Sequence, residues 1–137
     1  MRLAKNNIKE RIKGSFIELL DISFIENDSE TLEATMFVKP EFSQSTKRLH
    51  GGVTIALAET IAGVGSNSIC AEDEFTVGLQ VSANHISGAQ LGDTVRAIGT
   101  LLHKGRTTHV WNVDVILEGT EKLVSSVRVI NLVLKIN

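Results

Sequence analysis

A single acid stands within an otherwise apolar run of residues, where a carboxylate could take part in chemistry. Between Leu49 and Val64 only Glu59 carries a formal charge. The run has no continuous polar face, which predicts a helix enclosed by other parts of the structure. Burying a carboxylate there is costly unless the group is partnered or tends to become neutral. Glu59 is therefore either compensated structurally or used for chemistry.

The segment His50-Gly51-Gly52 opens this helix. Glycines leave backbone N–H groups uncovered, so a ligand oxygen can approach the positive end of the helix dipole. Such an end stabilises an anion, or an oxygen that becomes anionic during a reaction. Taken alone, His-Gly-Gly also fits a flexible turn, and Gln44 fits an exposed loop amide. The presence of Glu59 further along the helix favours the chemical interpretation.

The spacing of His50 and Glu59 bears on assembly. A separation of nine positions along a helix makes about two and a half turns and a rise of about 13 Å, so the two side chains point to opposite sides. If both act in one reaction, the simplest geometry is a two-fold dimer. The helix start of one chain would then meet the mid-helix acid of its partner.

Three segments carry a resemblance to a known family: Gln44 with His50-Gly51-Gly52, then Leu57-Ala58-Glu59, then residues 77–85. With this Gln-x5-His-Gly-Gly-x6-Glu signature the chain resembles the hotdog-fold acyl-CoA thioesterases. The most similar group holds the Arthrobacter-type 4-hydroxybenzoyl-CoA thioesterase and the proofreading thioesterase of enterobactin biosynthesis. The resemblance spans residues 14–134 and implies an α+β hotdog fold, a curved antiparallel sheet wrapped around one long central helix.

The resemblance also implies the reaction, which is hydrolysis of an aromatic or medium-chain acyl-CoA to free acid and CoA without a cofactor. Glu59 is expected to be either a nucleophile on the thioester carbon or a general base for water. Gly51 is expected to present its N–H to the thioester oxygen. His50 would help to hold this region, and Gln44 would bind the leaving thiolate side or orient water. The runner-up interpretation is an acyl-CoA-binding or sensing module without significant turnover.

Contacts to coenzyme A are implied at two segments, with Gly78 lining the pantetheine slot. The first segment is His85, Ile86, Ser87 and Gly88, and the second is His103, Lys104, Gly105, Arg106, Thr107 and Thr108. The basic residues and hydroxyls of the second segment suit phosphate groups. Taken alone, this segment also fits an ordinary strand connection, and His85 also fits a capped strand-end histidine.

One position departs from the family pattern. The family places a Ser or Thr one turn after the acid, where its hydroxyl helps to position water or the carboxylate. Here that residue is Gly63, while Ser66 lies seven residues after Glu59 and on roughly the same helix face. The departure bears on turnover and gives the binding-module interpretation some weight.

Composition bounds the remaining possibilities. A chain of 137 residues, 42% hydrophobic and 22% charged, fits one globular domain over residues 1–137. A net charge of −2 does not indicate a nucleic-acid partner. The four histidines lack zinc-ligand spacing, and no Gly-x-Ser-x-Gly elbow indicates a serine hydrolase. The lone Cys70 fits inert packing in a reducing, cytoplasmic location. The resemblance further implies a homotetramer, a dimer of dimers.

The pattern of apolar residues predicts the elements that position these groups. Residues 1–13 fit a short amphipathic helix, and no stretch is long and apolar enough for a secretory signal or a membrane span. The long helix should end near Cys70, and Trp111 should pack in the core or an interface. Alternation and turn residues predict strands over residues 15–27, 31–39, 77–86, 94–102, 107–117 and 123–134, with Pro40 at the end of the second.

Overall fold

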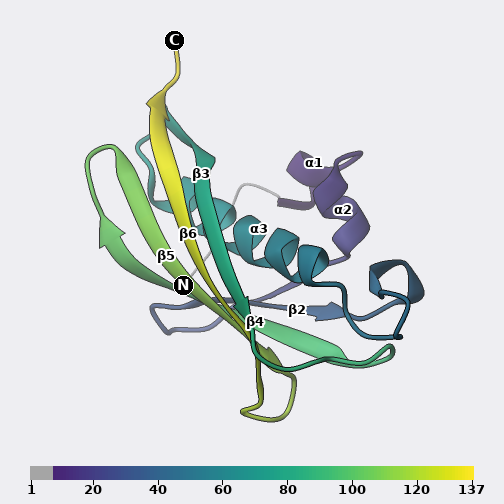
Figure 1. Cartoon of the computed structure of the whole chain (residues 1–137). Coiled ribbons are helices and arrows are strands. Elements are labelled where there is room, and N and C mark those ends of the chain that lie inside the picture. The colour runs from purple at the N-terminus through teal and green to yellow at the C-terminus, as the bar shows by residue number, and fades with distance from the viewer. Residues whose placement is uncertain (1–7) are drawn as a thin grey trace.

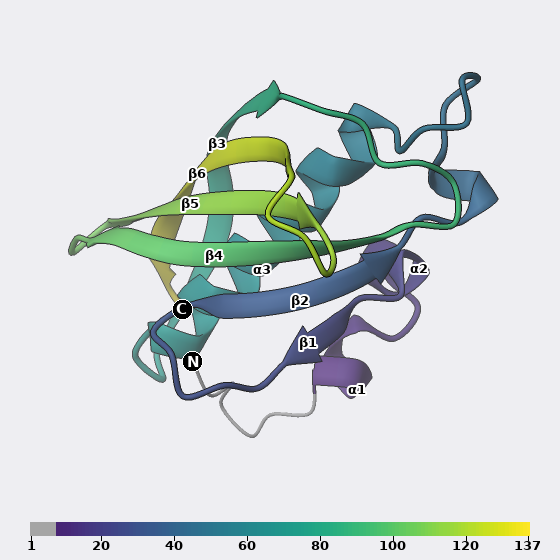
Figure 2. The same ribbon diagram turned by 90° about the horizontal axis from the view of Figure 1, so that it is seen from below.

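The computed structural model describes residues 8–137, which form a curved antiparallel sheet with one long helix, α3 (Gly51–Ile69), across its concave face (Figure 1). The strands are β1 (Ser23–Ile25), β2 (Leu32–Phe37), β3 (Glu74–His85), β4 (Thr94–Lys104), β5 (Thr108–Leu117) and β6 (Leu123–Lys135). They lie in the order β1-β2-β4-β5-β6-β3, which Figure 2 shows from below. The predicted arrangement of a sheet wrapped around one helix is confirmed.

The predicted extent of the central helix is also confirmed. His50 caps its start, since the His50 Nδ1 atom accepts a hydrogen bond of 2.9 Å from the Gly52 N–H. The helix ends at Ile69, and Cys70 is already extended. Leu57 and Ile61 are fully buried against the sheet. A β-extended N-cap with a side-chain acceptor satisfies one of the free N–H groups that every helix start leaves.

The prediction that this helix is enclosed on all sides is wrong. The residues facing the sheet are buried, whereas those on the opposite face are half-buried or exposed, and Glu59 is exposed. The apolar run predicted enclosure, but an apolar pattern does not say which chain supplies the cover. Within residues 8–137, that cover is incomplete.

Beneath α3 the core is built by alternation along the strands. Every second residue is buried from Val95 to Gly99 in β4 and from His109 to Val115 in β5. Trp111 is completely buried, and its Nε1–H donates to the Ser66 hydroxyl at 2.8 Å. The prediction that Trp111 packs in the core is therefore confirmed.

The edge strand β3 contains a β-bulge. Gly78 pairs with Asn131 and Gln80 pairs with Ile130, which leaves Leu79 as an extra residue. Because side chains of a strand alternate between its faces, one extra residue switches the face that later residues present. Burial follows this switch: Glu74 and Thr76 are the half-buried residues before the bulge, and Val81 and Ala83 after it.

The segment before the sheet differs from its prediction. A strand over residues 15–27 is wrong in its first half, where α2 (Phe16–Leu20) is a short helix that ends at Asp21 in the left-handed conformation. Of that range only Ser23–Ile25 is a strand. A five-residue segment with four apolar side chains is too short for its period to distinguish helix from strand, and here burial of Leu20 selects the helix.

At the N-terminus the helix α1 (Ile8–Ile12) forms part of the predicted helix over residues 1–13, and the remainder of that prediction lies outside the described residues. The second strand ends at Phe37, and Pro40 opens the 3-10 helix η1 (Pro40–Phe42). In the part of the chain that the structure describes, no helix is long and apolar enough to cross a bilayer.

Candidate active site

The start of α3 presents a backbone N–H group without a protein acceptor. The N–H of Gly52 binds His50 Nδ1, and those of Val53 and Thr54 bind the His50 carbonyl oxygen at 3.0 and 3.2 Å. Among the described residues, the Gly51 N–H is the first-turn donor that remains unpaired. It lies at the positive end of a 19-residue helix, where an oxygen that gains negative charge is stabilised.

A loop folds back beside this helix start and places Gln44 there. The N–H of Gln44 donates to the Arg48 carbonyl oxygen at 2.8 Å, and the N–H of His50 donates to the Phe42 carbonyl oxygen at 2.8 Å. The side chain of Gln44 is exposed. The sequence register between Gln44 and His50 is thus converted into proximity by a backbone hairpin.

The first segment predicted to contact CoA also lies at the helix start. The imidazole of His85 packs on Gly51 so closely that a Cβ atom added to Gly51 would lie 2.6 Å from His85 Nε2. The ring is held from its other side, where Nδ1 and the Ser125 hydroxyl are 2.7 Å apart. Gly51 is required here because any side chain would displace the imidazole.

The residues after His85 continue along the same side. The Ser87 hydroxyl donates to the Leu123 carbonyl oxygen at 2.5 Å, Gly88 packs on the stem of Arg48, and Ile86 is exposed. The structure therefore brings together His50, Gly51, Gln44, His85, Ile86, Ser87 and Gly88.

Glu59 belongs to a different neighbourhood. Its carboxylate lies against the edge strand, where Oε1 occupies the space that a side chain at position 78 would need. Gly78 is therefore the residue that lets the acid lie on β3. Ser66 does not share this space, because it is completely buried and accepts hydrogen bonds from Trp111 and from Asn131 Nδ2, the latter at 2.9 Å.

The second segment predicted to contact CoA is far from the first within one chain. Thr108 and Val77 both pair with Leu132, whereas His85 pairs with Ser125, seven residues earlier on β6. Seven residues of strand span about 24 Å. The turn formed by His103, Lys104, Gly105, Arg106, Thr107 and Thr108 therefore lies toward the Gly78 end of β3.

The shifted titrating groups near this turn lie outside both neighbourhoods. Burial lowers the pKa of His109, and the nearby Lys104 lowers it further. Burial also raises the pKa of the Cys70 thiol. Within residues 8–137, no group of three His, Cys, Asp or Glu side chains is arranged to hold a metal ion.

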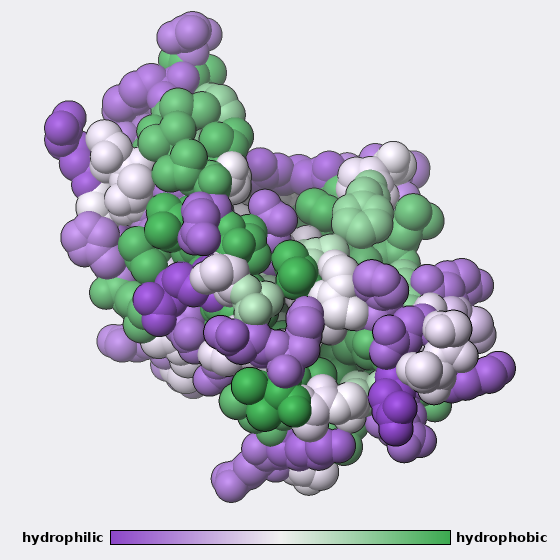
Figure 3. All heavy atoms as spheres, in the orientation of Figure 1, coloured by the Kyte–Doolittle hydropathy of each residue, from purple (hydrophilic) through white to green (hydrophobic). Residues whose placement is uncertain are grey.

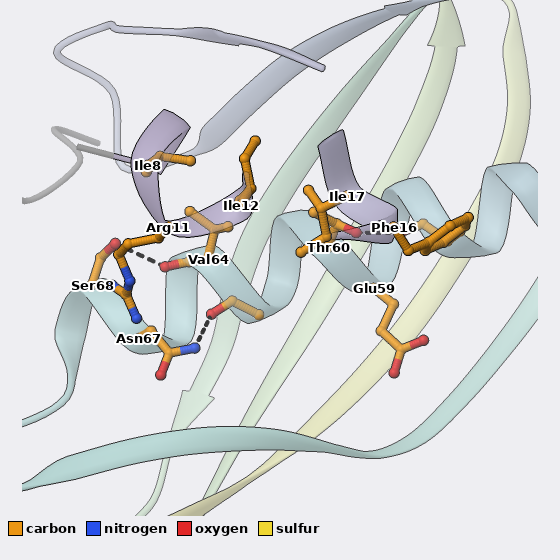
Figure 4. Close-up of a pocket in the computed structure, with 12 residues that line it drawn as sticks. Ile8, Arg11, Ile12, Phe16, Ile17, Glu59, Thr60, Val64, Asn67 and Ser68 are labelled. Atoms are coloured by element: carbon orange, nitrogen blue, oxygen red, sulfur yellow. Dashed lines mark hydrogen bonds between the residues drawn. The ribbon is translucent and has the colours of Figure 1, made fainter. Parts of the chain in front are cut away.

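A cavity of about 490 Å³ opens beside Glu59, between α3 and the two short helices α1 and α2 (Figure 4). Its lining comprises Ile8, Arg11, Ile12, Phe16, Ile17, Ala56, Glu59, Thr60, Gly63, Val64, Asn67 and Ser68. Gly63 faces open space, since a Cβ atom added there would have no heavy atom within 4 Å. The position of the missing family hydroxyl is thus part of a cavity wall.

Sequence reasoning did not identify Arg11 and Asn67, which line the cavity, or Ser125, which contacts His85 near the start of α3. Arg11 is one of several cations in the first turns of the chain, and nothing in its spacing indicates that it lines a cavity. Ser125, which holds His85, sits forty residues away on another strand. The one indication of Ser125 in the sequence is that a polar residue occupies an inward position of an alternating strand.

Comparisons with known proteins identify the family of the chain. Residues 46–124 match the family described as the thioesterase superfamily. The chain is 38% identical over 104 residues to the 1,4-dihydroxy-2-naphthoyl-CoA hydrolase of Escherichia coli, covering 75% of each chain. It is 33% identical over 100 residues to the proofreading thioesterase EntH of Cronobacter turicensis, covering 73% of this chain and 72% of that one.

Solved structures give the same result. The thioesterase HI1161 of Haemophilus influenzae superimposes with a TM-score of 0.89 at 31% identity, covering 98% of this chain and 93% of that chain. The sheet curved around α3 is the hotdog fold that the sequence resemblance predicted. The chain belongs to the thioesterase superfamily and is a thioester hydrolase.

Proposed function

We propose that the chain hydrolyses acyl-CoA thioesters at a site shared by two copies of the chain. Glu59 of one copy and the Gly51 N–H of the other act on the same thioester. Names of relatives support the substrate class, because the Escherichia coli relative is called a naphthoyl-CoA hydrolase. An aromatic or medium-chain acyl group is the expected range.

The observation that carries the proposal is the separation of two half-sites along β3. Glu59 rests against Gly78, the fifth residue of β3, and Gly51 rests against His85, the last residue of the strand. Pairing two β3 strands antiparallel about an axis near residues 81–82 would place residue 78 of one copy opposite residue 85 of the other. Each two-fold dimer then contains two complete sites.

The exposed edge of β3 supports such pairing. This strand of 12 residues ends the sheet, so its outer backbone groups are unpaired within residues 8–137. It exposes Phe75, Val77 and Leu79 at 39, 41 and 58% of their surface. Figure 3 shows apolar surface along this side of the molecule. A long apolar edge strand is a site for association with another chain.

In this site the thioester oxygen accepts a hydrogen bond from the Gly51 N–H, which stabilises the negative charge that develops on it. Two routes are open for Glu59. Its carboxylate attacks the carbonyl carbon, CoA leaves as the C–S bond breaks, and water hydrolyses the resulting anhydride. Alternatively the carboxylate takes a proton from water as the water oxygen attacks, and the sulfur is protonated as it leaves. Both routes consume one water and yield the acid and CoA.

The shared site also reconciles the two CoA segments. The segment His85, Ile86, Ser87 and Gly88 lies with Gly51, and the turn over residues 103–108 lies toward the Glu59 end of β3. Antiparallel pairing brings the first segment of one copy toward the second segment of its partner. Association of two such dimers into a tetramer is the further assembly that we expect.

The test is release of free thiol from a panel of acyl-CoAs by the wild type, Glu59→Gln and the control Glu72→Gln. Glu72 is exposed beyond the helix end, so its substitution removes the same charge away from the site. Glu59→Gln should lower turnover at least about a hundredfold, because the amide neither attacks carbon nor accepts the proton of water. Near wild-type turnover by this variant would exclude Glu59 as the nucleophile or general base. Binding of acyl-CoA without thiol release by the wild type would instead identify a sensing module.

Subunit mixing tests the shared site. Inactive His50→Ala and inactive Glu59→Ala proteins should regain activity when their subunits exchange, because mixed dimers hold one site with both native residues. Verified exchange without recovery of activity would rule out the shared geometry.

A further inference from the structure

The cavity beside Glu59 has the size and position of an acyl site. Its volume of about 490 Å³ lies within the range of small-molecule pockets. Glu59 lines it, so an acyl group whose carbonyl meets this carboxylate would extend into it. The inference therefore rests on the proposed function.

The cavity wall sets the length of that acyl group. Glu59, Gly63 and Asn67 follow one another at intervals of one turn along α3 and all line the cavity. The first and last of these residues are about 12 Å apart along the helix axis. Apolar side chains of Ile12 and Val64 lie between the two ends of this path in Figure 4, and the absent side chain of Gly63 keeps it open.

The far end of the cavity is polar and carries a positive charge. Figure 4 shows Arg11, Asn67 and Ser68 grouped at that end, away from Glu59. Two of the twelve lining residues are charged, Glu59 and Arg11. The positive charge of Arg11 at the far end is therefore opposite to the negative charge of the Glu59 carboxylate.

Arg11 is the residue of this group whose donors are free. Asn67 already bridges α3 and β3, since its Nδ2–H donates to the Gly63 carbonyl oxygen and its Oδ1 accepts from the Thr76 N–H, both at 2.9 Å. The Ser68 hydroxyl donates to the Val64 carbonyl oxygen at 2.8 Å. Among the residues that the structure describes, none hydrogen-bonds or pairs with the Arg11 guanidinium.

We propose that this cavity selects acyl groups that end in a carboxylate, which the Arg11 guanidinium binds. The planar guanidinium matches a carboxylate with two parallel N–H donors. The apolar middle of the cavity suits the methylene or aryl part of such a group. The substrate class is thus the CoA monothioester of a dicarboxylic acid.

The test compares two substrates that differ only in the far group, octanoyl-CoA and suberoyl-CoA, the eight-carbon dicarboxylic monothioester. We expect Arg11→Gln to lower the ratio of kcat/KM for suberoyl-CoA to that for octanoyl-CoA at least about fivefold. The effect is moderate because the guanidinium is exposed and its ion pair is partly screened. Arg11→Lys should recover part of the ratio, since it keeps the charge and loses the fork.

The matched control is Lys9→Gln, which removes the same charge from the same short helix at a residue that does not line the cavity. It should leave the ratio within about twofold, as surface charges that meet no ligand contribute little. An unchanged ratio in Arg11→Gln, or an equal change in Lys9→Gln, would overturn the proposal.

A binding measurement separates this proposal from the proposed function. Titration calorimetry with Glu59→Gln protein gives the affinities of both thioesters without turnover. Adding Arg11→Gln to this background should weaken suberoyl-CoA at least about fivefold relative to octanoyl-CoA. If the wild type hydrolyses no thioester of the acyl-CoA panel, the proposed function fails, and these affinities still decide whether Arg11 recognises the carboxylate. Equal weakening of both thioesters would contradict such recognition.

Discussion

Glycines lie on both faces of α3, and they have opposite effects on how closely each face is packed. On the face toward the sheet, a Cβ atom added to Gly65 would lie 2.6 Å from the Trp111 ring. On the opposite face, a Cβ atom added to Gly63 would meet nothing within 4 Å. The first glycine allows close packing of a large side chain, and the second leaves volume unfilled. Close packing on one face stabilises the fold, and the unfilled space on the other is where we propose that the acyl group binds.

The polar groups of the two faces differ in the same sense. Toward the sheet, the Ser66 hydroxyl accepts hydrogen bonds from Trp111 Nε1–H and Asn131 Nδ2–H at 2.8 and 2.9 Å. Toward the cavity, Glu59 and Arg11 have no hydrogen-bond or ion-pair partner among residues 8–137. Buried polar groups without partners destabilise a fold, so the satisfied set belongs to the structure. Glu59 and Arg11 are the two charged residues on the cavity side, and we propose that both contact the substrate.

The largest effect is expected from Gly78→Ala, which adds one methyl group to β3 where the Glu59 carboxylate lies against the strand. The new Cβ would overlap Glu59 Oε1. The carboxylate can swing away, so the free energy of unfolding should change little, but a displaced acid should lower kcat/KM about a hundredfold. Assays of thiol release and thermal unfolding measure both quantities. Thr100→Ala, at an exposed position of β4 away from β3, is the control, and full activity in Gly78→Ala would show that β3 does not position the acid.

Gly65→Ala, on the face of α3 toward the sheet, should instead lower the stability of the fold. The added methyl overlaps ring atoms of the fully buried Trp111 at 2.6 and 2.7 Å, so the ring or the helix must shift. Overpacking of this kind lowers the free energy of unfolding by about 1–3 kcal/mol. Urea denaturation followed by tryptophan fluorescence measures the change. A variant as stable as the wild type would mean that the core is looser than the structure indicates.

The smallest effect is expected from Gly63→Ala, which should stabilise the protein. Alanine in a helix interior is favoured over glycine by about 0.5–1 kcal/mol, and here it meets no neighbour. The methyl group also narrows the cavity, so turnover of bulky acyl-CoAs should fall a few-fold relative to short ones. Paired denaturation curves and kcat/KM values check both outcomes. Loss of stability would show that the space at Gly63 is filled in solution.

The elements that the sequence predicted well are those whose pattern is local. The bounds of α3 follow from its apolar length and from His50 at its start, and β4, β5 and β6 follow from alternation. The proximity of Gly51 to Glu59 in sequence did not show that they rest against β3 residues seven apart, His85 and Gly78. The helix α2 was mistaken for a strand, because five residues with four apolar side chains contain too little of either period.

The cavity and its charge could not be predicted, because they depend on how separate segments meet. Arg11 reaches the far end of the cavity from a helix that precedes α3 by some forty residues. The exposure of Glu59 was missed for a related reason. Apolar composition predicts that a face will be covered, but it does not say whether the same chain or another one covers it.

The bulge in β3 fixes how many residues may separate the two half-sites. Gly78 and His85 are seven apart, an odd number that would put them on opposite faces of a regular strand. The extra residue Leu79 restores both to the side of α3. Inserting one residue between them while the bulge remains would turn His85 away from Gly51 and expose the inward-facing side chains that follow. Deleting Leu79 would instead remove the bulge and leave Gly78 and His85 six apart, an even number that keeps both on the side of α3. This part of β3 therefore tolerates loss of the bulge residue better than a single-residue insertion.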